Sequence, residues 1–377
     1  MVTANVRARS VVVPVERPTR ISTRVLRERH YLLVEVTTSD GVGTGYAYAG
    51  TNGGRLLAGA VEDLLQPVLR DMPADNISDV WERMYQESLL AGRRGALLRA
   101  ISAVDIALWD LRAKACGVPL AVLLGGSITR PVPAYASGGY YRPGDGPYEQ
   151  AIVQEITANQ QAGFTDHKIK VGGLPVEQDA TRVAAASEAI GGRGRLALDA
   201  NNAYRTVDGA LRAARAFERA AGPNGLWWFE EPLSPENIAG HAELARILET
   251  PVATGEIHQT RWEFAQLINC HAADVLQPDA GVLGGVTEWL RVAHAADAFG
   301  FQVAPHWHAN LHAHLAAAVP NALAIEHFDL GKDIYNFERL LTEQSRLHVR
   351  DGAAHLSDRP GIGVEFDEAT VARYEQG

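Results

Sequence analysis

Short apolar runs alternate with alanine-rich segments from about residue 131 onward, and this alternation restricts the possible folds more than any other feature of the chain. Eight runs occur, namely VPAYAS, HKIKVGG, RLALDAN, LWWFEEP, PVATGE, DVLQPDA, FQVAPH and LAIEHF. Most are almost continuously apolar, as expected for strands buried on both faces of a parallel sheet. Eight such strands over roughly 220 residues favour a closed (β/α) barrel over an open sheet.

Ionisable residues end these runs at a regular spacing. After the first run they are Lys170, Asp199, Glu230, Glu256, Asp279, His306 and Glu326, and successive members are 20 to 31 residues apart. Each step has the length of one βα unit, and in a barrel these strand ends open on the face that carries the chemistry. A single acid after a strand is most often the N-cap of the next helix. Seven ionisable residues in consecutive register instead predict one ring of side chains.

Three acids of this ring, Asp199, Glu230 and Glu256, come from consecutive runs. Converging carboxylates repel each other and require a counter-charge. Hard oxygen ligands without Cys or His favour Mg²⁺, with Mn²⁺ as an alternative. Pairing of each acid with a surface arginine would not explain why each one ends an apolar strand.

Two groups suited to proton transfer flank these acids in the sequence. Lys168 and Lys170 form a K-x-K pattern on one strand, so both side chains face the same way. Each ammonium group is expected to lower the pKa of the other, toward the range in which a lysine acts as a base. Asp279 is expected to orient the imidazole of His306, which then serves as a general acid or base.

The first 130 or so residues have a different pattern. YLLVEVTT and GTGYAYAG flank an Asp-Gly turn, which predicts an antiparallel pair over residues 31 to 50. Helical stretches follow at residues 54–71, 77–88 and 95–117. Strands followed by helices indicate a separate α+β unit.

Composition limits the class of partner and the compartment. The formal charge of −10, with no Lys/Arg-rich stripe, argues against nucleic acid or an anionic membrane as the main partner. No apolar run approaches the roughly 20 residues needed to span a bilayer, and the N-terminus lacks a signal-peptide pattern. Cys116 and Cys270 lie far apart, so a disulfide framework is not expected. These features predict a cytoplasmic protein.

The KIK, DAN, FEEP, TGE, PDAGVLGG, APH and IEH segments, in this order, closely resemble the mandelate racemase group of the enolase superfamily. Residues 100–126 resemble the long helical signature of that family. The resemblance implies an α/β fold in which a (β/α)7β barrel of residues 131–344 lies below an α+β capping domain of residues 1–130. The C-terminal tail, about 345–377, is expected to return to the capping domain. It also implies abstraction of the proton alpha to a carboxylate, with Mg²⁺ stabilising the enediolate.

The resemblance also implies a role for each matching residue. Asp199, Glu230 and Glu256 match the metal ligands, whereas Glu231 matches a residue that does not bind metal. Lys170 matches the base, Lys168 its electrostatic partner, and Asp279 with His306 the catalytic dyad. Glu326 matches an acid that must be at least partly protonated to donate a hydrogen bond to the substrate carboxylate. Asn201 matches a substrate-contacting amide.

The ring is compatible with more than one reaction. We expect dehydration of a sugar acid to a 2-keto-3-deoxy acid, because most members of the family that the chain resembles are acid-sugar dehydratases. Return of a proton to the alpha carbon by the second residue would instead give a racemase or epimerase of a 2-hydroxy acid. The cycloisomerase branch is less similar, because it carries a lysine where this chain has Asp279 and lacks the equivalent of His306. A noncatalytic binding protein would have been expected to lose Lys170, a ligand or His306.

Further residues were assigned from their positions. His258 and His308 lie close in sequence to ring members and are expected to contact substrate, whereas His312 and His314 are expected to be helix residues rather than zinc ligands. Loops at 16–28 and 46–54 are expected to cover the barrel mouth. Arginines there either select a distal hydroxyl or carboxylate or belong to the solvated surface. The resemblance implies a homo-oligomer.

Overall fold

The computed structural model describes residues 5–142, 144, 146–332 and 334–376. Its N-terminal part is an antiparallel sheet with strand order β14-β1-β2-β3. The strands are β1 (Asn5–Arg20), β2 (Val25–Thr38) and β3 (Gly41–Tyr48), with β14 (Glu375–Gln376) from the C-terminus pairing with β1. The β2–β3 pair turns between Thr38 and Gly41, which confirms the hairpin predicted from the Asp-Gly turn.

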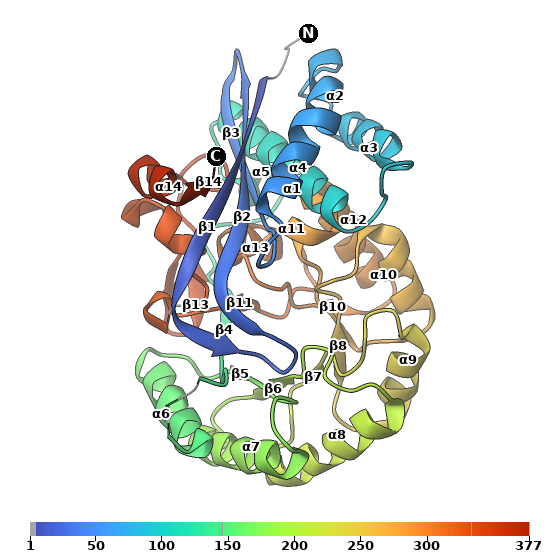
Figure 1. Cartoon of the computed structure of the whole chain (residues 1–377), viewed down its shortest axis with the longest axis vertical. Helices are drawn as coiled ribbons and strands as arrows, with labels where there is room; N and C mark the ends of the chain where they lie inside the picture. Colours follow the sequence, from blue (N-terminus) through green and yellow to red (C-terminus); the bar gives the residue numbers. More distant parts are fainter. Residues whose placement is uncertain (1–4, 143, 145, 333, 377) are drawn as a thin grey trace.

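No strand was predicted for residues 5–20, yet these residues form β1, the longest strand among the described residues. It pairs with β2 along most of its length and shifts register between Pro14 and Thr19. Figure 1 shows β1 and β2 running down from the cap, with their turn over the barrel. The missed strand therefore places a loop above the predicted ring.

The helices of the cap follow the predicted stretches. Residues 54–71 form α1 (Gly54–Ala60), a π-helical turn (Val61–Leu65) and α2 (Gln66–Asp71), followed by α3 (Ile77–Ser88), α4 (Ala96–Ala115) and the short α5 (Leu120–Leu123). α4 packs directly on β3, where a Cβ at Gly45 would lie 1.9 Å from the carbonyl oxygen of Ala103. Glycine is required there because the helix backbone occupies the space of a side chain.

α4 also joins the cap to the barrel. Buried Asp105 accepts hydrogen bonds from the backbone N–H of Thr287 at 3.0 Å and from its hydroxyl at 2.6 Å. Trp109 donates to the same hydroxyl at 2.9 Å. Burial raises the pKa of Asp105 to about 7. These contacts fix the cap over one side of the barrel.

The second part is a closed barrel of eight parallel strands, as predicted. They are β4 (Val132–Gly138), β5 (His167–Lys170), β6 (Leu196–Asp199), β7 (Phe229–Glu230), β8 (Val252–Thr254), β9 (Val275–Leu276), β10 (Gln302–Val303) and β11 (Ile325–His327). β11 pairs with β4, and a bridge between Val303 and Ala322 joins β10 to the segment before β11. Each of the eight predicted apolar runs contains one of these strands.

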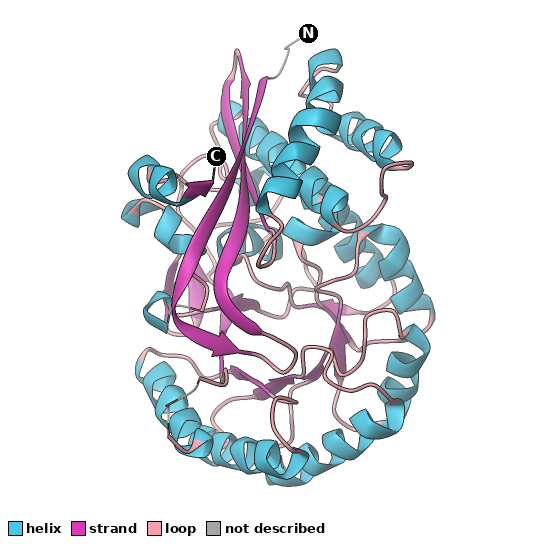
Figure 2. Ribbon diagram, in the orientation of Figure 1, coloured by secondary structure: helices cyan, strands magenta, loops and turns pink. Residues whose placement is uncertain are grey.

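Helices surround the barrel strands, as Figure 2 shows. They are α6 (Tyr148–Gln161), α7 (Val176–Ile190), α8 (Val207–Ala221), α9 (Ile238–Ile247), α10 (Thr260–Asn269), α11 (Ala280–Leu283), α12 (Gly285–Ala298) and α13 (Ala309–Ala316). The strand-to-strand connections thus number seven, as a (β/α)7β barrel requires. The predicted fold class is confirmed.

Short elements complete the chain. They are the 3₁₀ turns Gly222–Asn224, Leu330–Lys332, Phe337–Leu340 and Glu343–Ser345, the strands β12 (His348–Arg350) and β13 (Ala353–His355), and α14 (Glu368–Tyr374). Arg9 of β1 binds Glu368 of α14 through two hydrogen bonds of 2.7 and 2.9 Å. Within the described part of the chain, every helix is too short or too polar to cross a bilayer. Cys116 and Cys270 are both free and exposed.

Candidate active site

Strand register brings the predicted ring together at one end of the barrel. Lys170 is the register partner of Asp199, and Asp199 is the register partner of Glu230. These three side chains therefore stand next to each other on adjacent strands. Glu256 follows β8 by two residues, and Glu326 lies on β11.

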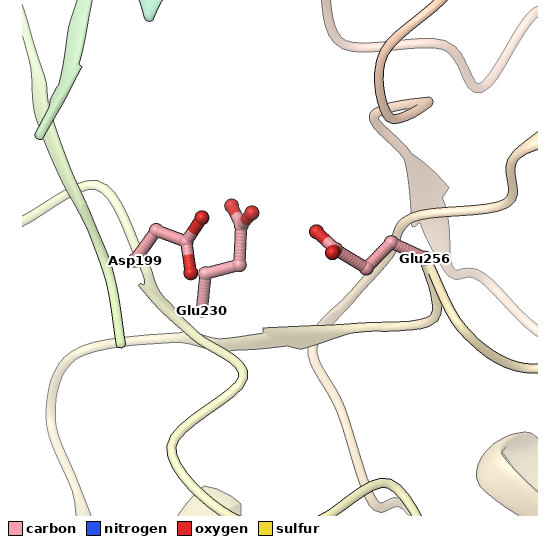
Figure 3. Close-up of side chains that lie close together, drawn as sticks. All are labelled: Asp199, Glu230 and Glu256. Carbon is pink, nitrogen blue, oxygen red and sulfur yellow. The ribbon is translucent and has the colours of Figure 1, made fainter. Parts of the chain in front are cut away.

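The three predicted metal ligands form one cluster. A carboxylate oxygen from each of Asp199, Glu230 and Glu256 lies within 4.8 Å of the other two. Figure 3 shows Asp199 and Glu230 side by side, with Glu256 reaching toward them from the opposite side. Burial and the charges of Asp199 and Glu256 raise the pKa of Glu230 to about 8, although Lys168 lowers it. The cluster thus concentrates negative charge where water is excluded.

The donor set suits a hard divalent cation. All the converging atoms are carboxylate oxygens, which Mg²⁺ prefers. The Oε2 atom of Glu256 is buried yet has no hydrogen-bond partner among the described residues. A buried carboxylate oxygen without a donor is costly. A cation at this position would satisfy it.

Two residues that the sequence analysis missed hold Glu230 in place. Its Oε2 accepts hydrogen bonds from the indole of Trp228 at 2.8 Å and the amide of Gln277 at 2.7 Å. Trp228 lies two residues before Glu230, and Gln277 lies two residues before Asp279. Side chains two residues apart on a strand point to the same side, so each of these residues points to the same side as the ring member that follows it. That spacing was the available signal.

Lys168 links two acids of the ring. Its Nζ lies 2.6 Å from Glu230 and 2.8 Å from Glu326. Burial raises the pKa of Glu326, but Lys168, His306 and Lys170 outweigh this effect and lower it well below its usual value. Three cations near this carboxylate thus favour its charged form in the arrangement described here, and its hydrogen bond to a substrate carboxylate stays a prediction.

Lys170 is buried and ion-paired with Asp199. Its ammonium group also lies 5.1 Å from the ring centroid of Tyr140. Burial and Lys168 lower the pKa of Lys170, but Asp199 and Tyr140 raise it, and the result is above the ordinary value. The predicted lowering by Lys168 is thus present, but the ion pair with Asp199 outweighs it.

Asp279 and His306 form the predicted dyad. The Nδ1 atom of His306 lies 2.8 Å from Asp279, and its Nε2 atom lies 3.6 Å from Glu256. Asp279 is also the N-cap of α11 and accepts from the N–H of Gly281. Burial lowers the pKa of His306, but Glu256 and Asp279 raise it to about 9. Asp279 thus orients the ring so that Nε2 faces the carboxylate cluster.

The remaining predicted contacts fall into two groups. Asn201 lines the cavity above the cluster and its amide donates to Asp199 at 3.2 Å. The other two, His258 and His308, are buried and do not line this cavity. Their side chains pack into the protein, so their contact with substrate stays a prediction that this cavity does not support. His308 contacts the hydroxyl of Tyr335 at 3.0 Å, and the ring of His258 packs near Phe264.

His312 and His314 are helix residues, as expected. Both are buried in α13. His312 accepts from the N–H of Ala280 at 3.0 Å, and His314 accepts from the N–H of Ala121 at 3.2 Å. Their function is to satisfy backbone donors.

A cavity of about 320 Å³ lies between the ring and the cap. Lys170, Glu256 and His306 line it from the barrel, and residues of the β1–β2 turn and of 48–51 line it from the cap. The loops predicted to cover the barrel mouth therefore do so (Figure 1). Lys170, Glu256 and His306 thus face one space between the barrel and the cap.

Comparison with known families identifies this arrangement. Residues 3–125 match the "Mandelate racemase / muconate lactonizing enzyme, N-terminal domain" family, and residues 151–370 match the "Enolase C-terminal domain-like" family. The chain belongs to the mandelate racemase/muconate lactonizing enzyme group of the enolase superfamily.

Curated relatives of similar length catalyse different reactions. The chain is 34% identical to L-talarate/galactarate dehydratase of Salmonella typhimurium, over 91% of this chain and 82% of the relative. It is 33% identical to arabinonate dehydratase of Saccharolobus solfataricus, over 90% and 89%. It is 32% identical to 3,6-anhydro-alpha-L-galactonate cycloisomerase of Streptomyces coelicolor, over 98% and 99%. Overall identity therefore does not separate these activities, and the expected difference from cycloisomerases at Asp279 and His306 stays a prediction.

Solved structures show the same fold. A racemase from Streptomyces coelicolor with bound magnesium has a TM-score of 0.90 at 31% identity, with both chains fully covered. L-Talarate dehydratase from Polaromonas, complexed with Mg and L-glucarate, has a TM-score of 0.86 at 33% identity over 100% of this chain and 97% of that one. An enolase from Bradyrhizobium complexed with magnesium and mandelic acid has a TM-score of 0.86 at 31% identity, with both chains fully covered.

Proposed function

We propose that this protein is a Mg²⁺-dependent dehydratase that converts a sugar acid to its 2-keto-3-deoxy acid. The observation that supports it best is the placement of Lys170 and His306 across the barrel mouth from each other, with the carboxylate cluster between them. Lys170 is paired with Asp199, and His306 faces Glu256. A substrate carbon between them has a proton-transfer group on each side.

The cofactor is Mg²⁺, held by Asp199, Glu230 and Glu256. When bound, the ion supplies positive charge that stabilises negative charge developing on the substrate carboxylate. Such stabilisation is needed because a proton alpha to a carboxylate is very weakly acidic.

The protein's own groups complete the reaction. Lys170, in its neutral form, takes the C2 proton, and Mg²⁺ bound to Asp199 would favour that form by offsetting the charge that raises the pKa of this lysine. Lys168 supplies a fixed positive charge two residues away on the same strand. Protonated His306 donates a proton to the C3 hydroxyl as its C–O bond breaks, so that water leaves. Asp279 keeps the imidazole in position through the 2.8 Å contact. The resulting enol becomes the 2-keto acid after a proton is added at C3.

The cavity supports a polyhydroxylated substrate. Arg24, Thr51, Tyr140, Asn201 and Asn202 all line it and offer hydrogen-bond donors. Sugar hydroxyls need such partners when they leave water. Two of the curated relatives are sugar-acid dehydratases, and a related dehydratase structure holds L-glucarate.

Racemisation or epimerisation of a 2-hydroxy acid is the second candidate. It uses the same pair of groups, with His306 returning a proton to C2 instead of protonating a leaving hydroxyl. The racemase structure with bound magnesium supports it. Cycloisomerisation, the activity of one relative, is a third candidate.

Screening of sugar acids with and without metal tests the proposal. The protein, freed of metal with EDTA, is incubated with mono- and dicarboxylic sugar acids, and 2-keto products are measured. We expect a keto product from at least one acid only after Mg²⁺ is restored, because the three carboxylates are expected to hold this ion at the substrate carboxylate. Full activity in the metal-free protein, or an inverted acid without any keto product, would contradict the dehydratase.

A further inference from the structure

The cap side of the active-site cavity carries cations without acids. Among the residues that line this cavity, the cap contributes Arg24, Arg29 and Arg99 and no carboxylate, whereas Glu231 and Glu256 come from the barrel. The cap side of the cavity is therefore positively charged.

Arg29 is fixed and buried on β2. Its side chain is 3% exposed, its Nε donates to the carbonyl of Ile334 at 2.7 Å, and Nη1 donates to the hydroxyl of Tyr48 at 3.0 Å. The guanidinium lies 4.5 Å from the ring centroid of Trp307, the residue after His306. No carboxylate of the described chain lies within ion-pair distance of it. A buried cation without a counter-charge is costly unless a ligand supplies one.

Arg99 of α4 also lines the cavity. Its Nη1 donates to the backbone carbonyl of Tyr48 at 2.8 Å, and this arginine too has no carboxylate partner within ion-pair distance in the described ranges. Tyr48 therefore contacts both guanidinium groups, one through its hydroxyl and one through its carbonyl. One neutral residue thus binds a guanidinium group at each of its two ends.

Resting on the function proposed above, we propose that the substrate is a dicarboxylic sugar acid whose second carboxylate is bound by Arg29 and Arg99. The first carboxylate lies at the metal cluster, so the other end of the chain extends toward the cap. Planar guanidinium groups match a carboxylate with two parallel hydrogen bonds. The arginines act on specificity and take no part in proton transfer.

Matched acids test this assignment. The Mg²⁺-loaded protein is given a hexaric acid, the hexonic acid of the same configuration, and its 6-phosphate. We expect kcat/KM for the diacid to exceed that for the hexonic acid by about 100-fold or more, since a buried charge pair is lost with the hexonic acid. Arg29→Met should reduce this ratio by about 100-fold. Arg27→Met, an exposed residue of the same strand that does not line the cavity, should leave the ratio unchanged.

The outcomes separate the two proposals. Preference for the hexonic acid or its phosphate, or an equal loss on both acids in Arg29→Met, would overturn the dicarboxylate assignment while leaving the dehydratase intact. If no acid is turned over, the proposed dehydratase activity is wrong, and calorimetry then tests the dicarboxylate assignment alone. The diacid should bind about 100-fold more tightly than the hexonic acid. Equal affinities would reject the dicarboxylate assignment. Should Arg29→Met not fold, Arg99→Met is expected to give the same reduction of the ratio.

Discussion

Replacement of Lys170 by alanine is expected to lower kcat by about 10⁴-fold, the upper part of the range for loss of a general base. The residue is buried beside Asp199 and is separated from His306 by the carboxylate cluster. No other lysine in the described chain lines the active-site cavity, so none can take its place. Steady-state assay of keto-acid formation measures the effect.

Control variants distinguish the loss of a proton-accepting group from the loss of the positive charge at residue 170. Lys170→Arg keeps the positive charge beside Asp199 but has a side chain that does not deprotonate, so it should be as inactive as Lys170→Ala. Added methylamine should restore part of the activity of Lys170→Ala, because a small amine fits the vacated space. Near-normal turnover in Lys170→Arg would show that the residue is electrostatic and that another group is the base.

The second large effect is expected for His306→Asn, with turnover lowered by about 10³-fold. Asparagine can still donate to Asp279 but has no titratable proton to deliver to the leaving hydroxyl. Because Lys170 is unchanged, the C2 proton should still exchange with solvent deuterium while little keto product forms. Nuclear magnetic resonance of the recovered acid measures this exchange.

Loss of C2 exchange in His306→Asn would place proton abstraction on His306 and reverse the two roles. Asp279→Asn provides the matched comparison, since it leaves the imidazole present but weakens its orientation. It should impair turnover less than His306→Asn does.

The barrel and its acid cluster could be predicted because both depend on a pattern that repeats along the sequence, in which an apolar strand ends at an ionisable residue. Strands buried on both faces are continuously apolar, and the residue at the end of each one meets its neighbours when the barrel closes. Asp199 and Glu230 are register partners for this reason. Trp228 and Gln277 lie two residues before Glu230 and Asp279, respectively, and the alternation of side chains along a strand could have predicted that they point to the same side.

The rest depended on contacts between distant segments. β1 pairs with both β2 and the C-terminal β14, and the short-range turn signal of the β2–β3 hairpin did not extend to it. The direction in which His258 and His308 point was decided by the packing of helices and cap. The charge states of Lys170 and Glu326 depend on partners from other strands, Asp199 and Lys168 respectively. Sequence spacing places such groups in a ring but does not give the distances that set their pKa values.

In the proposed reaction, a C2 proton is removed and water is then lost from the same substrate. This reaction is tested most directly by nuclear magnetic resonance of one reaction run in D₂O with the Mg²⁺-loaded protein and a sugar acid that it consumes. We expect a 2-keto-3-deoxy acid that carries solvent deuterium at C3 and has lost the C2 hydrogen. Recovery of a 2-hydroxy acid with deuterium and inverted configuration at C2, without keto product, would contradict the proposed reaction.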